Sequence, residues 1–318
     1  MARKLSIHST ATLPTALSTS EPFSDGEVSR VVKRNFRTIA NRYHLGNEIG
    51  RGGLSRVYSA FDFETDRVVA VKQTMAKGDK DPLISIKNAL TEAAALMELD
   101  HKAIIKLLDY VIEDGEAYLV LEKLEESLID AVKKREVKGR LRSIRACLEI
   151  SSELSSAVAH MHSRQVIHRD IKPGNISLTP NGPKLFDFGL ARCPGGFDPL
   201  EANPDILIGS LKFMSPEQAG SGNPIGPYSD LYSFGATMYW MLSLGKNLFY
   251  PDTDLGCLMC HRHQKPKSLK AWNPLVPDDV VAVVEKALQK DPKDRFRSAD
   301  EMKKAIDGCI RKLPAIPG

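Results

Sequence analysis

A short polar segment and a turn just after it gather side chains that could transfer a phosphoryl group. The segment is His168-Arg169-Asp170-Ile171-Lys172-Pro173-Gly174-Asn175, and the turn is Asp187-Phe188-Gly189. Asp170 can accept or orient a hydroxyl proton, while Asn175 and Asp187 offer the hard oxygen ligands that suit Mg²⁺. Lys172 can neutralise charge on the transferred group. Because phosphoryl transfer is catalysed mostly by positioning and charge stabilisation, this set predicts that chemistry.

A glycine-rich segment between two predicted strands is a second candidate. It consists of Gly50, Arg51, Gly52, Gly53, Leu54, Ser55, Arg56 and Val57. Glycine lets the backbone approach a phosphate closely enough for N–H groups to point at it. Considered alone, the segment is explained slightly better as a plain hairpin turn.

Lys72 ends the apolar stretch Val69-Ala70-Val71. A lysine in this position usually lies at a solvated strand edge. It becomes a phosphate ligand when an acid fixes its ammonium group, and Glu92 lies on the next predicted helix. We therefore expect an ion pair between Lys72 and Glu92.

The surrounding sequence predicts a small strand-rich unit followed by a larger helical one. Strands are expected at 43–49, 57–61, 67–72, 110–112 and 117–121, with a helix at 83–99. Asp114-Gly115 between the last two strands is a strong hairpin signal. Helices are expected at 143–164 and 231–244, the second headed by Asp230 and apolar on nearly every face, which predicts that it is buried. Ser298 and Glu301 form a capping box for the last helix.

Together these residues resemble the signature set of the protein kinase family, from Tyr43 to Leu313. The resemblance implies the α+β two-lobed kinase fold. A small β-rich N-lobe with one main helix would span 43–121, a hinge 122–125, a larger helical C-lobe 126–313, and a tail 314–318. Residues 1–42 would be a mobile Ser/Thr-rich extension, with a short helix at 28–40. The family landmarks Ser215-Pro216-Glu217 and Arg295 also imply a structural ion pair between Glu217 and Arg295.

Lys172 and the pair Gly209-Ser210 resemble the serine/threonine branch of the family. The amino-acid sequences of these motifs are most similar to those of the eukaryotic-like kinases of bacteria. The implied activity is transfer of the γ-phosphoryl group of ATP to Ser or Thr hydroxyls of a protein substrate. The alternative is a pseudokinase that acts as a nucleotide-binding scaffold, although Lys72, Asp170 and Asp187 are all present.

The resemblance implies an ATP site in the cleft between the lobes. Lys72, fixed by Glu92, would hold the α- and β-phosphates, and Mg²⁺ or Mn²⁺ would be bound by Asn175 and Asp187. Asp170 would align the acceptor hydroxyl as catalytic base, with Lys172 beside it. The residues expected around the adenine and the loop that covers it include Ile49, Val57, Ala70, the gatekeeper Leu121, Glu122, Leu124 and Ser177.

Two features depart from the family pattern. Ser55 replaces the third loop glycine, a change that a small side chain tolerates. Ser177 replaces the apolar residue expected beneath the adenine, which removes contact worth roughly 1–2 kcal/mol and predicts weaker ATP binding. Phe186 is the neighbouring side chain that could compensate.

The segment between Gly189 and Gly209 contains no Ser, Thr or Tyr. Many kinases with Arg before the catalytic Asp are activated by phosphorylation of this segment. Here Asp198, Glu201 and Asp205 are available, and one of them is expected to pair with Arg169 in place of a phosphate. Solvated loop acids are the alternative interpretation.

Composition narrows the protein class further. The net charge of +4 is spread along the chain, which predicts no nucleic-acid surface, and no apolar run approaches the roughly 20 residues of a membrane span. The five cysteines indicate free thiols in a reducing compartment, so the cytoplasm is expected, with organellar targeting by the extension as the alternative. The Cys257-Leu258-Met259-Cys260-His261 stretch is read as an ordinary helix; a metal-binding module is a third hypothesis. Homodimerisation is left open.

Overall fold

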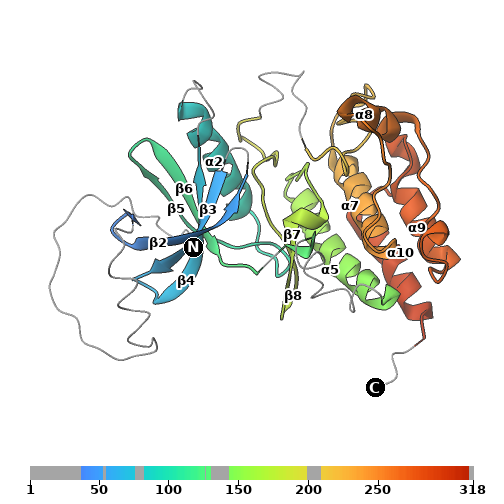
Figure 1. The fold of residues 1–318 in the computed structure, drawn as a ribbon, viewed down its shortest axis with the longest axis horizontal. Coiled ribbons are helices and arrows are strands. Elements are labelled where there is room, and N and C mark those ends of the chain that lie inside the picture. Colours follow the sequence, from blue (N-terminus) through green and yellow to red (C-terminus); the bar gives the residue numbers. More distant parts are fainter. Residues whose placement is uncertain are drawn as a thin grey trace.

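A computed structural model describes residues 37–52, 55–75, 82–125, 127–129, 143–198 and 209–314. Figure 1 shows a curled sheet at one end of the molecule and a group of helices at the other. The predicted α+β architecture with a small strand-rich lobe and a larger helical lobe is confirmed. The predicted positions Gly53 and Leu54 lie outside the described residues, as do Glu201 and Asp205.

The small lobe is a six-stranded antiparallel sheet in the order β1-β2-β3-β4-β6-β5. Its strands are β1 (Thr38–Ile39), β2 (Tyr43–Arg51), β3 (Ser55–Asp62), β4 (Arg67–Thr74), β5 (Leu107–Glu113) and β6 (Glu116–Glu122). In β4 the register places Lys72 opposite Val57 of β3 and Leu119 of β6. Lys72 is therefore on a central strand, and not at the solvated edge that such a lysine usually occupies.

The hairpin between β5 and β6 turns at Asp114 and Gly115, as predicted. Both residues have positive φ, 53° and 75°. Two successive positive φ angles are typical of the tight turn that matches the twist of antiparallel strands. The local sequence alone therefore fixes this part of the sheet.

Helix α2 (Pro82–Met97) covers one face of the sheet. Ala89, Ala93 and Leu96 repeat at helical spacing and are at most 3% exposed. These small side chains allow the helix to pack closely on the sheet, and Glu92 is carried on the same buried face at 4% exposure.

The sheet begins before the predicted domain boundary. Strand β1 lies at 38–39 and pairs with β2, and Ile39 is fully buried. Residues 38–39 therefore belong to the sheet, and residues 40–42 form the turn that joins them to β2. The domain start expected at Tyr43 coincides with the first residue of β2 and stays a prediction. The helix predicted at 28–40 is also wrong where the structure describes it, because Thr38 and Ile39 form a strand.

The large lobe is mostly helical. Its helices are α5 (Ile144–Ser163), α7 (Pro227–Leu242), α8 (Asp254–His263), α9 (Asp278–Ala287) and α10 (Ala299–Lys312). Short 3₁₀ helices lie at η1 (Pro173–Asn175), η2 (Leu269–Ala271) and η3 (Pro292–Asp294), and β7 (Ile176–Thr179) pairs with β8 (Gly182–Leu185). Every residue of α7 from Ser229 to Leu242 is buried, which confirms the predicted central helix.

Serine side chains cap two of these helices, and one of the two is the predicted cap Ser298. Ser143 caps α5 by accepting from the Ala146 N–H, and Ser298 caps α10 by accepting from the Glu301 N–H. The Glu301 carboxylate accepts from the Arg297 N–H, one residue before the predicted partner. Helix α7 begins at Pro227, so Asp230 lies inside its first turn and not at its head.

Across the parts of the chain that the structure describes, no helix combines the length and the apolar character needed to cross a bilayer.

Arg295 of the large lobe donates to both Glu217 oxygens at 2.7 and 2.9 Å, and neither side chain is exposed. The predicted structural ion pair is confirmed. It ties the segment after Ser215 to the segment before α10.

Candidate active site

Lys72 is held by two carboxylates at the junction of the lobes. Its Nζ lies 2.8 and 2.7 Å from the two Glu92 oxygens and 2.7 Å from Asp187 Oδ1. Strand β4 supplies the lysine, α2 the glutamate and the turn after β8 the aspartate. The predicted ion pair between Lys72 and Glu92 is confirmed, and Asp187 joins it.

The three charges adjust one another. Burial lowers the pKa of Lys72, but Asp187 and Glu92 raise it by more, so the net shift is upward. The positive charge of Lys72 lowers the pKa of Asp187 to about 2. Burial raises the pKa of Glu92, and Lys72 offsets part of that rise. Lys72 and Asp187 are consequently both charged at neutral pH.

Asp170 is surrounded by donors. Its Oδ2 accepts from Lys172 Nζ at 2.6 Å and from Asn175 Nδ2 at 3.1 Å, and its Oδ1 accepts from the Ser210 N–H at 2.9 Å. Lys172 Nζ also donates to Ser210 Oγ at 2.6 Å. The carboxylate orientation is thus fixed by three partners, one of which comes from the far side of the Gly189–Gly209 segment. Ser210, one of the pair that resembles the serine/threonine branch, therefore contacts both Asp170 and Lys172.

Asp230 fixes the backbone of the same loop. It is fully buried and accepts from the His168 and Arg169 N–H groups, each at 2.9 Å, and from His162 Nε2 at 2.9 Å. Arg169 has a φ of 64°, and such a strained backbone needs surrounding bonds to hold it. The sequence identified Asp230 as a family landmark at the head of the central helix, but it did not predict these contacts. A single acidic residue at the start of an otherwise apolar, buried helix was the signal that could have indicated a structural role for Asp230.

Two clusters of charged and polar side chains are connected through the backbone. One cluster is Lys72, Glu92 and Asp187, and the other is Asp170, Lys172 and Asn175. The Phe186 N–H donates to the Asn175 carbonyl at 2.9 Å, and the His168 ring packs on Phe188 with centroids 4.7 Å apart. Phe188 is 1% exposed, and Asp187 has a positive φ of 65° that turns its side chain toward Lys72. The backbone hydrogen bond between Phe186 and Asn175 therefore connects the group of Asp170 and Asn175 with the group of Lys72 and Asp187.

Arg169 makes a two-pronged ion pair with Asp198. The distances are 2.8 and 2.7 Å, and the two side chains are 3% and 6% exposed. Arg192 Nε lies 3.7 Å from the same carboxylate. The hypothesis that an acid of this segment pairs with Arg169 is confirmed for Asp198, and the alternative of a solvated loop acid is wrong for this residue.

The glycine-rich segment follows the predicted course where it is described. Gly50 pairs with Val57 in the sheet, and the Gly52 N–H donates to the Ser55 carbonyl at 2.8 Å. Ile49 is 49% exposed, and Arg51 pairs with Glu48 at 2.7 Å. Arg56 is partly buried and lies opposite Arg51. Gly50 therefore lies within the hairpin of β2 and β3 and Gly52 next to its turn, as both sequence interpretations require.

The residues expected around the adenine lie on both sides of the lobe junction. Val57, Ala70, Leu121 and Leu124 belong to the same apolar core, with Leu121 6% exposed near the end of β6. Glu122 accepts from Lys184 Nζ at 2.6 Å, linking the start of the predicted hinge to β8.

Ser177 lies on β7 and is fully buried, and its hydroxyl has no hydrogen-bond partner among the described atoms. Because the site is closed around a small side chain, a leucine there would have to displace its neighbours. The expectation that Ser177→Leu tightens ATP binding stays a prediction.

The donor set fits a hard divalent cation. Asn175 uses its amide nitrogen on the Asp170 carbonyl at 2.9 Å and on the Asp170 carboxylate, which leaves its amide oxygen as the group that can bind a cation. The Asp187 side chain is 44% exposed, and its pKa of about 2 keeps it ionised. Two oxygen ligands suit Mg²⁺, which retains waters and is completed by phosphate oxygens.

The cysteine and histidine stretch lies on α8. Cys257 donates to the Leu211 carbonyl at 3.4 Å, and His261 Nδ1 lies 3.1 Å from the Tyr232 hydroxyl. Burial lowers the pKa of His261 to about 3, so the ring is neutral. These contacts connect α8 to α7 and to the segment after Ser210.

Comparison with known proteins gives a consistent result. The family model for the protein kinase domain matches residues 43–305. A probable serine/threonine-protein kinase of Streptomyces coelicolor is 34% identical over 285 residues, covering 87% of this chain and 41% of the relative. Serine/threonine-protein kinase PrkC of Bacillus subtilis is 33% identical over 271 residues, covering 85% and 41%. Serine/threonine-protein kinase PknA of Mycobacterium tuberculosis is 34% identical over 275 residues, covering 85% and 61%.

The predicted similarity to bacterial serine/threonine kinases is thereby confirmed. The chain spans about two fifths to three fifths of the length of these relatives. The matched region runs from the first residue of β2 into α10, and it contains each residue of the two clusters described above. With the family model covering well over half of its length, the chain belongs to the protein kinase family.

Proposed function

We propose that this chain transfers the γ-phosphoryl group of ATP to serine or threonine hydroxyls of a protein substrate. One observation carries the proposal: Lys72, Asp187, Asn175 and Asp170 converge where the two lobes meet, through contacts of 2.7–3.1 Å within each cluster. An ammonium group, a fixed carboxylate and two oxygen ligands for a divalent cation are the groups that phosphoryl transfer requires.

In this proposal Asp170 orients the acceptor hydroxyl and takes its proton. Its carboxylate is held by Lys172, Asn175 and the Ser210 N–H, so little reorganisation is needed when the substrate arrives. Lys172 lies 2.6 Å from the same carboxylate and can place its charge on the transferred phosphoryl oxygens.

Lys72 would bind the α- and β-phosphates while Glu92 holds its ammonium group. The buried Glu92 would position the lysine by its ion pair and would not contact the nucleotide itself. Asn175 and Asp187 would hold Mg²⁺ or Mn²⁺, which when bound neutralises phosphate charge. Val57, Ala70, Leu121 and Leu124 supply an apolar surface of the kind that suits an adenine ring.

Asp170→Asn tests the proposal, because the amide keeps the shape of the side chain but cannot take a proton. With radiolabelled ATP and a protein substrate, transfer should fall by about a hundredfold to ten-thousandfold. ATP binding, measured by calorimetry, should change little. Asp252→Asn is the matched control, because Asp252 is exposed in the large lobe.

The scaffold alternative predicts a different pair of results. A scaffold would bind ATP and show no transfer in either the natural chain or Asp170→Asn. Equal transfer by both would mean that Asp170 is not the catalytic base. Either result would overturn the assignment.

A further inference from the structure

A pocket opens in the large lobe between the end of α7, the segment that follows α8, and α9. Its volume is about 230 Å³. Figure 1 shows α8 and α9 at the end of the molecule away from the sheet, so the pocket is separate from the site described above. None of its lining residues takes part in either cluster of the candidate active site.

The inner wall of the pocket is apolar and rigid. Leu269, Val284 and Leu288 line it and are at most 5% exposed. Tyr239 also lines it, and its hydroxyl donates to the Lys267 carbonyl at 2.9 Å and accepts from Trp272 Nε1 at 2.8 Å. The tyrosine is therefore fixed by its hydroxyl while its ring contributes to the wall.

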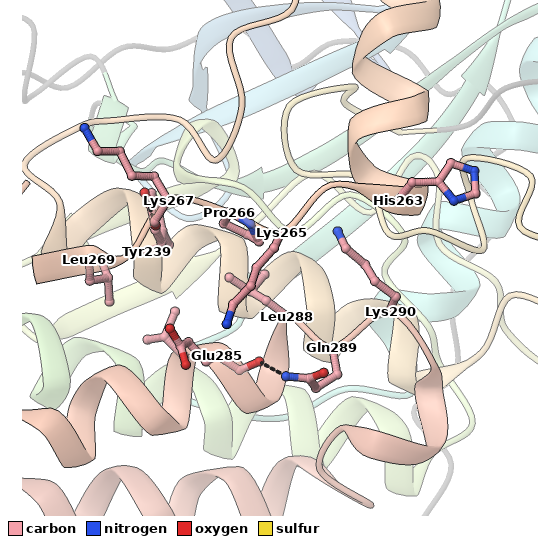
Figure 2. A pocket seen from close by; sticks show the side chains of 11 residues that line it. Tyr239, His263, Lys265, Pro266, Lys267, Leu269, Glu285, Leu288, Gln289 and Lys290 are labelled. Carbon is pink, nitrogen blue, oxygen red and sulfur yellow. Dashed lines mark hydrogen bonds between the residues drawn. The ribbon is translucent and has the colours of Figure 1, made fainter. Parts of the chain in front are cut away.

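The mouth of the pocket is basic. Figure 2 shows Lys265 and Lys290 extending past one another from facing segments, with Glu285 and Gln289 below Lys265. Lys267 and His263 also line the pocket but extend outward in this view. Glu285 is the one acidic side chain among the lining residues that the structure describes.

Lys265 and Lys290 at the mouth of the pocket differ from neighbouring lysines. Neither forms an ion pair with a carboxylate in the part of the chain that the structure describes. On the same stretch of chain Lys270 pairs with Asp278, and on α9 Lys286 pairs with Glu301 at 2.8 Å. Lys290 donates instead to neutral groups, the His261 carbonyl at 2.8 Å, the Tyr232 hydroxyl at 3.3 Å and the Cys260 carbonyl at 3.5 Å. Burial lowers its pKa to about 8. A carboxylate placed beside Lys290 would stabilise its charged form.

We propose that this pocket binds an acidic segment of a partner protein that inserts one large apolar side chain. The volume suits a single leucine or phenylalanine side chain and is below the roughly 300 Å³ at which small-molecule sites begin. Glutamate or aspartate on either side of the inserted residue would face Lys265 and Lys290. An apolar anchor with complementary charge around it is a common mode of peptide recognition.

Fluorescence anisotropy tests the proposal with the full chain and a labelled peptide, Glu-Glu-Leu-Glu-Glu. Binding should weaken as salt rises, and Lys265→Glu should weaken it about fivefold. Glu285→Gln should strengthen binding, because it removes the acid at the mouth. Lys270→Glu is the matched control: the residue is exposed on the same segment but is not among those that line the pocket. All variants should keep the unfolding temperature of the natural chain.

Two further peptides complete the test. Replacing Leu by Ser, or all Glu by Gln, should each reduce binding about tenfold, since the anchor and the charges both contribute. The proposal is wrong if neither replacement matters, if Lys270→Glu acts like Lys265→Glu, or if no binding is measured. Self-association of the chain that Lys265→Glu abolishes would identify a second copy as the occupant and would also overturn it.

Discussion

At the scale of single residues, the site depends on charges whose partners are fixed. Lys72 has Glu92 and Asp187, Asp170 has Lys172 and Asn175, and Arg169 has Asp198. A buried charge needs such a partner, because an unpaired one is strongly disfavoured in a low-dielectric interior. Each acid in the list can therefore be tested by removing its charge alone.

Asp198→Asn should leave the Arg169 guanidinium buried without a counter-charge. We expect a loss of about 3 kcal/mol in the free energy of unfolding, with a lower rate of phosphoryl transfer. Chemical denaturation and the radiolabelled ATP assay measure the two effects. Asp252→Asn, at an exposed position of the large lobe, is the control and should be neutral.

Asp198 already pairs with Arg169, and residues 190–208 offer no hydroxyl group. We therefore expect the proposed activity not to require phosphorylation of this segment. Phosphatase treatment should leave the transfer rate unchanged. Loss of activity after that treatment, or full activity and stability in Asp198→Asn, would contradict the role given to Asp198.

Ser177→Ala should stabilise the protein. The buried hydroxyl of Ser177 has no partner among the described atoms, and an unsatisfied hydroxyl is disfavoured by about 1 kcal/mol or more. Calorimetry should show an unfolding temperature higher by about 2 °C. Ser151→Ala is the comparison, because the buried Ser151 hydroxyl donates to the Cys147 carbonyl at 2.7 Å, and its removal should not stabilise. A lower unfolding temperature in Ser177→Ala would show that the hydroxyl has a partner.

At the scale of elements, each functional side chain is placed by a strand, a helix or a capped turn. Strand β4 and helix α2 set the distance between Lys72 and Glu92, while α7 carries Asp230, which binds the backbone of the loop at 168–175. Helix α10 packs against α5 and α9 at the base of the large lobe. These helices therefore stabilise the lobe that carries the candidate site, although α10 does not contact the site.

Ser298→Ala should destabilise the large lobe by about 1 kcal/mol, because the Ser298 side chain accepts from the Glu301 N–H at 3.1 Å at the start of α10. The unfolding temperature should fall by about 2 °C. Ser268→Ala is a close control, since Ser268 precedes η2 and makes no capping hydrogen bond with its side chain. Equal effects from both changes would show that the cap has no specific role.

At the scale of the whole molecule, one apolar core joins the two lobes. It includes Ala93 and Leu119 of the small lobe and Leu148 and Leu231 of the large one. Backbone hydrogen bonds cross the same junction, from the Ile105 N–H to the Leu185 carbonyl at 2.9 Å and from Leu185 back to Ala103. The lobes are consequently coupled in stability, and a change in either should affect unfolding of the whole.

Acid should unfold the protein partly through Asp62. Arg42 donates to both of its oxygens at 2.6 Å, and these bonds lower the pKa of Asp62 from its ordinary 3.8 to about 2. A lowered pKa gives stability that is complete above about pH 4 and is lost as the pH falls toward 2. Asp62→Asn should therefore flatten the decline of the unfolding temperature over this range.

Asp66→Asn, in the exposed turn that follows, provides the comparison and should keep the decline of the natural chain. Thermal unfolding followed by circular dichroism at several pH values measures both variants. An unchanged slope in Asp62→Asn would mean that this ion pair does not control acid stability.

The sequence by itself determined most of the elements and predicted the side chains of the candidate site. Hydrophobic periodicity, turn residues and caps act over a few positions, so β2 to β6, α2, α5 and α10 could be predicted from local patterns. The order of the motifs predicted Lys72, Glu92, Asp170, Asn175 and Asp187 as one set. The sequence also limited the candidate partners of Arg169 to three acidic residues.

Only the tertiary structure decided among those acids and brought the set together. Lys72 and Asp187 are 115 positions apart, and their contact exists because the apolar core joins the two lobes at a fixed distance. The support of the catalytic loop by Asp230, the short strand β1 and the basic pocket near α9 likewise depend on packing between distant segments. Such contacts are set by side-chain shape and burial over the whole molecule, which no local pattern contains.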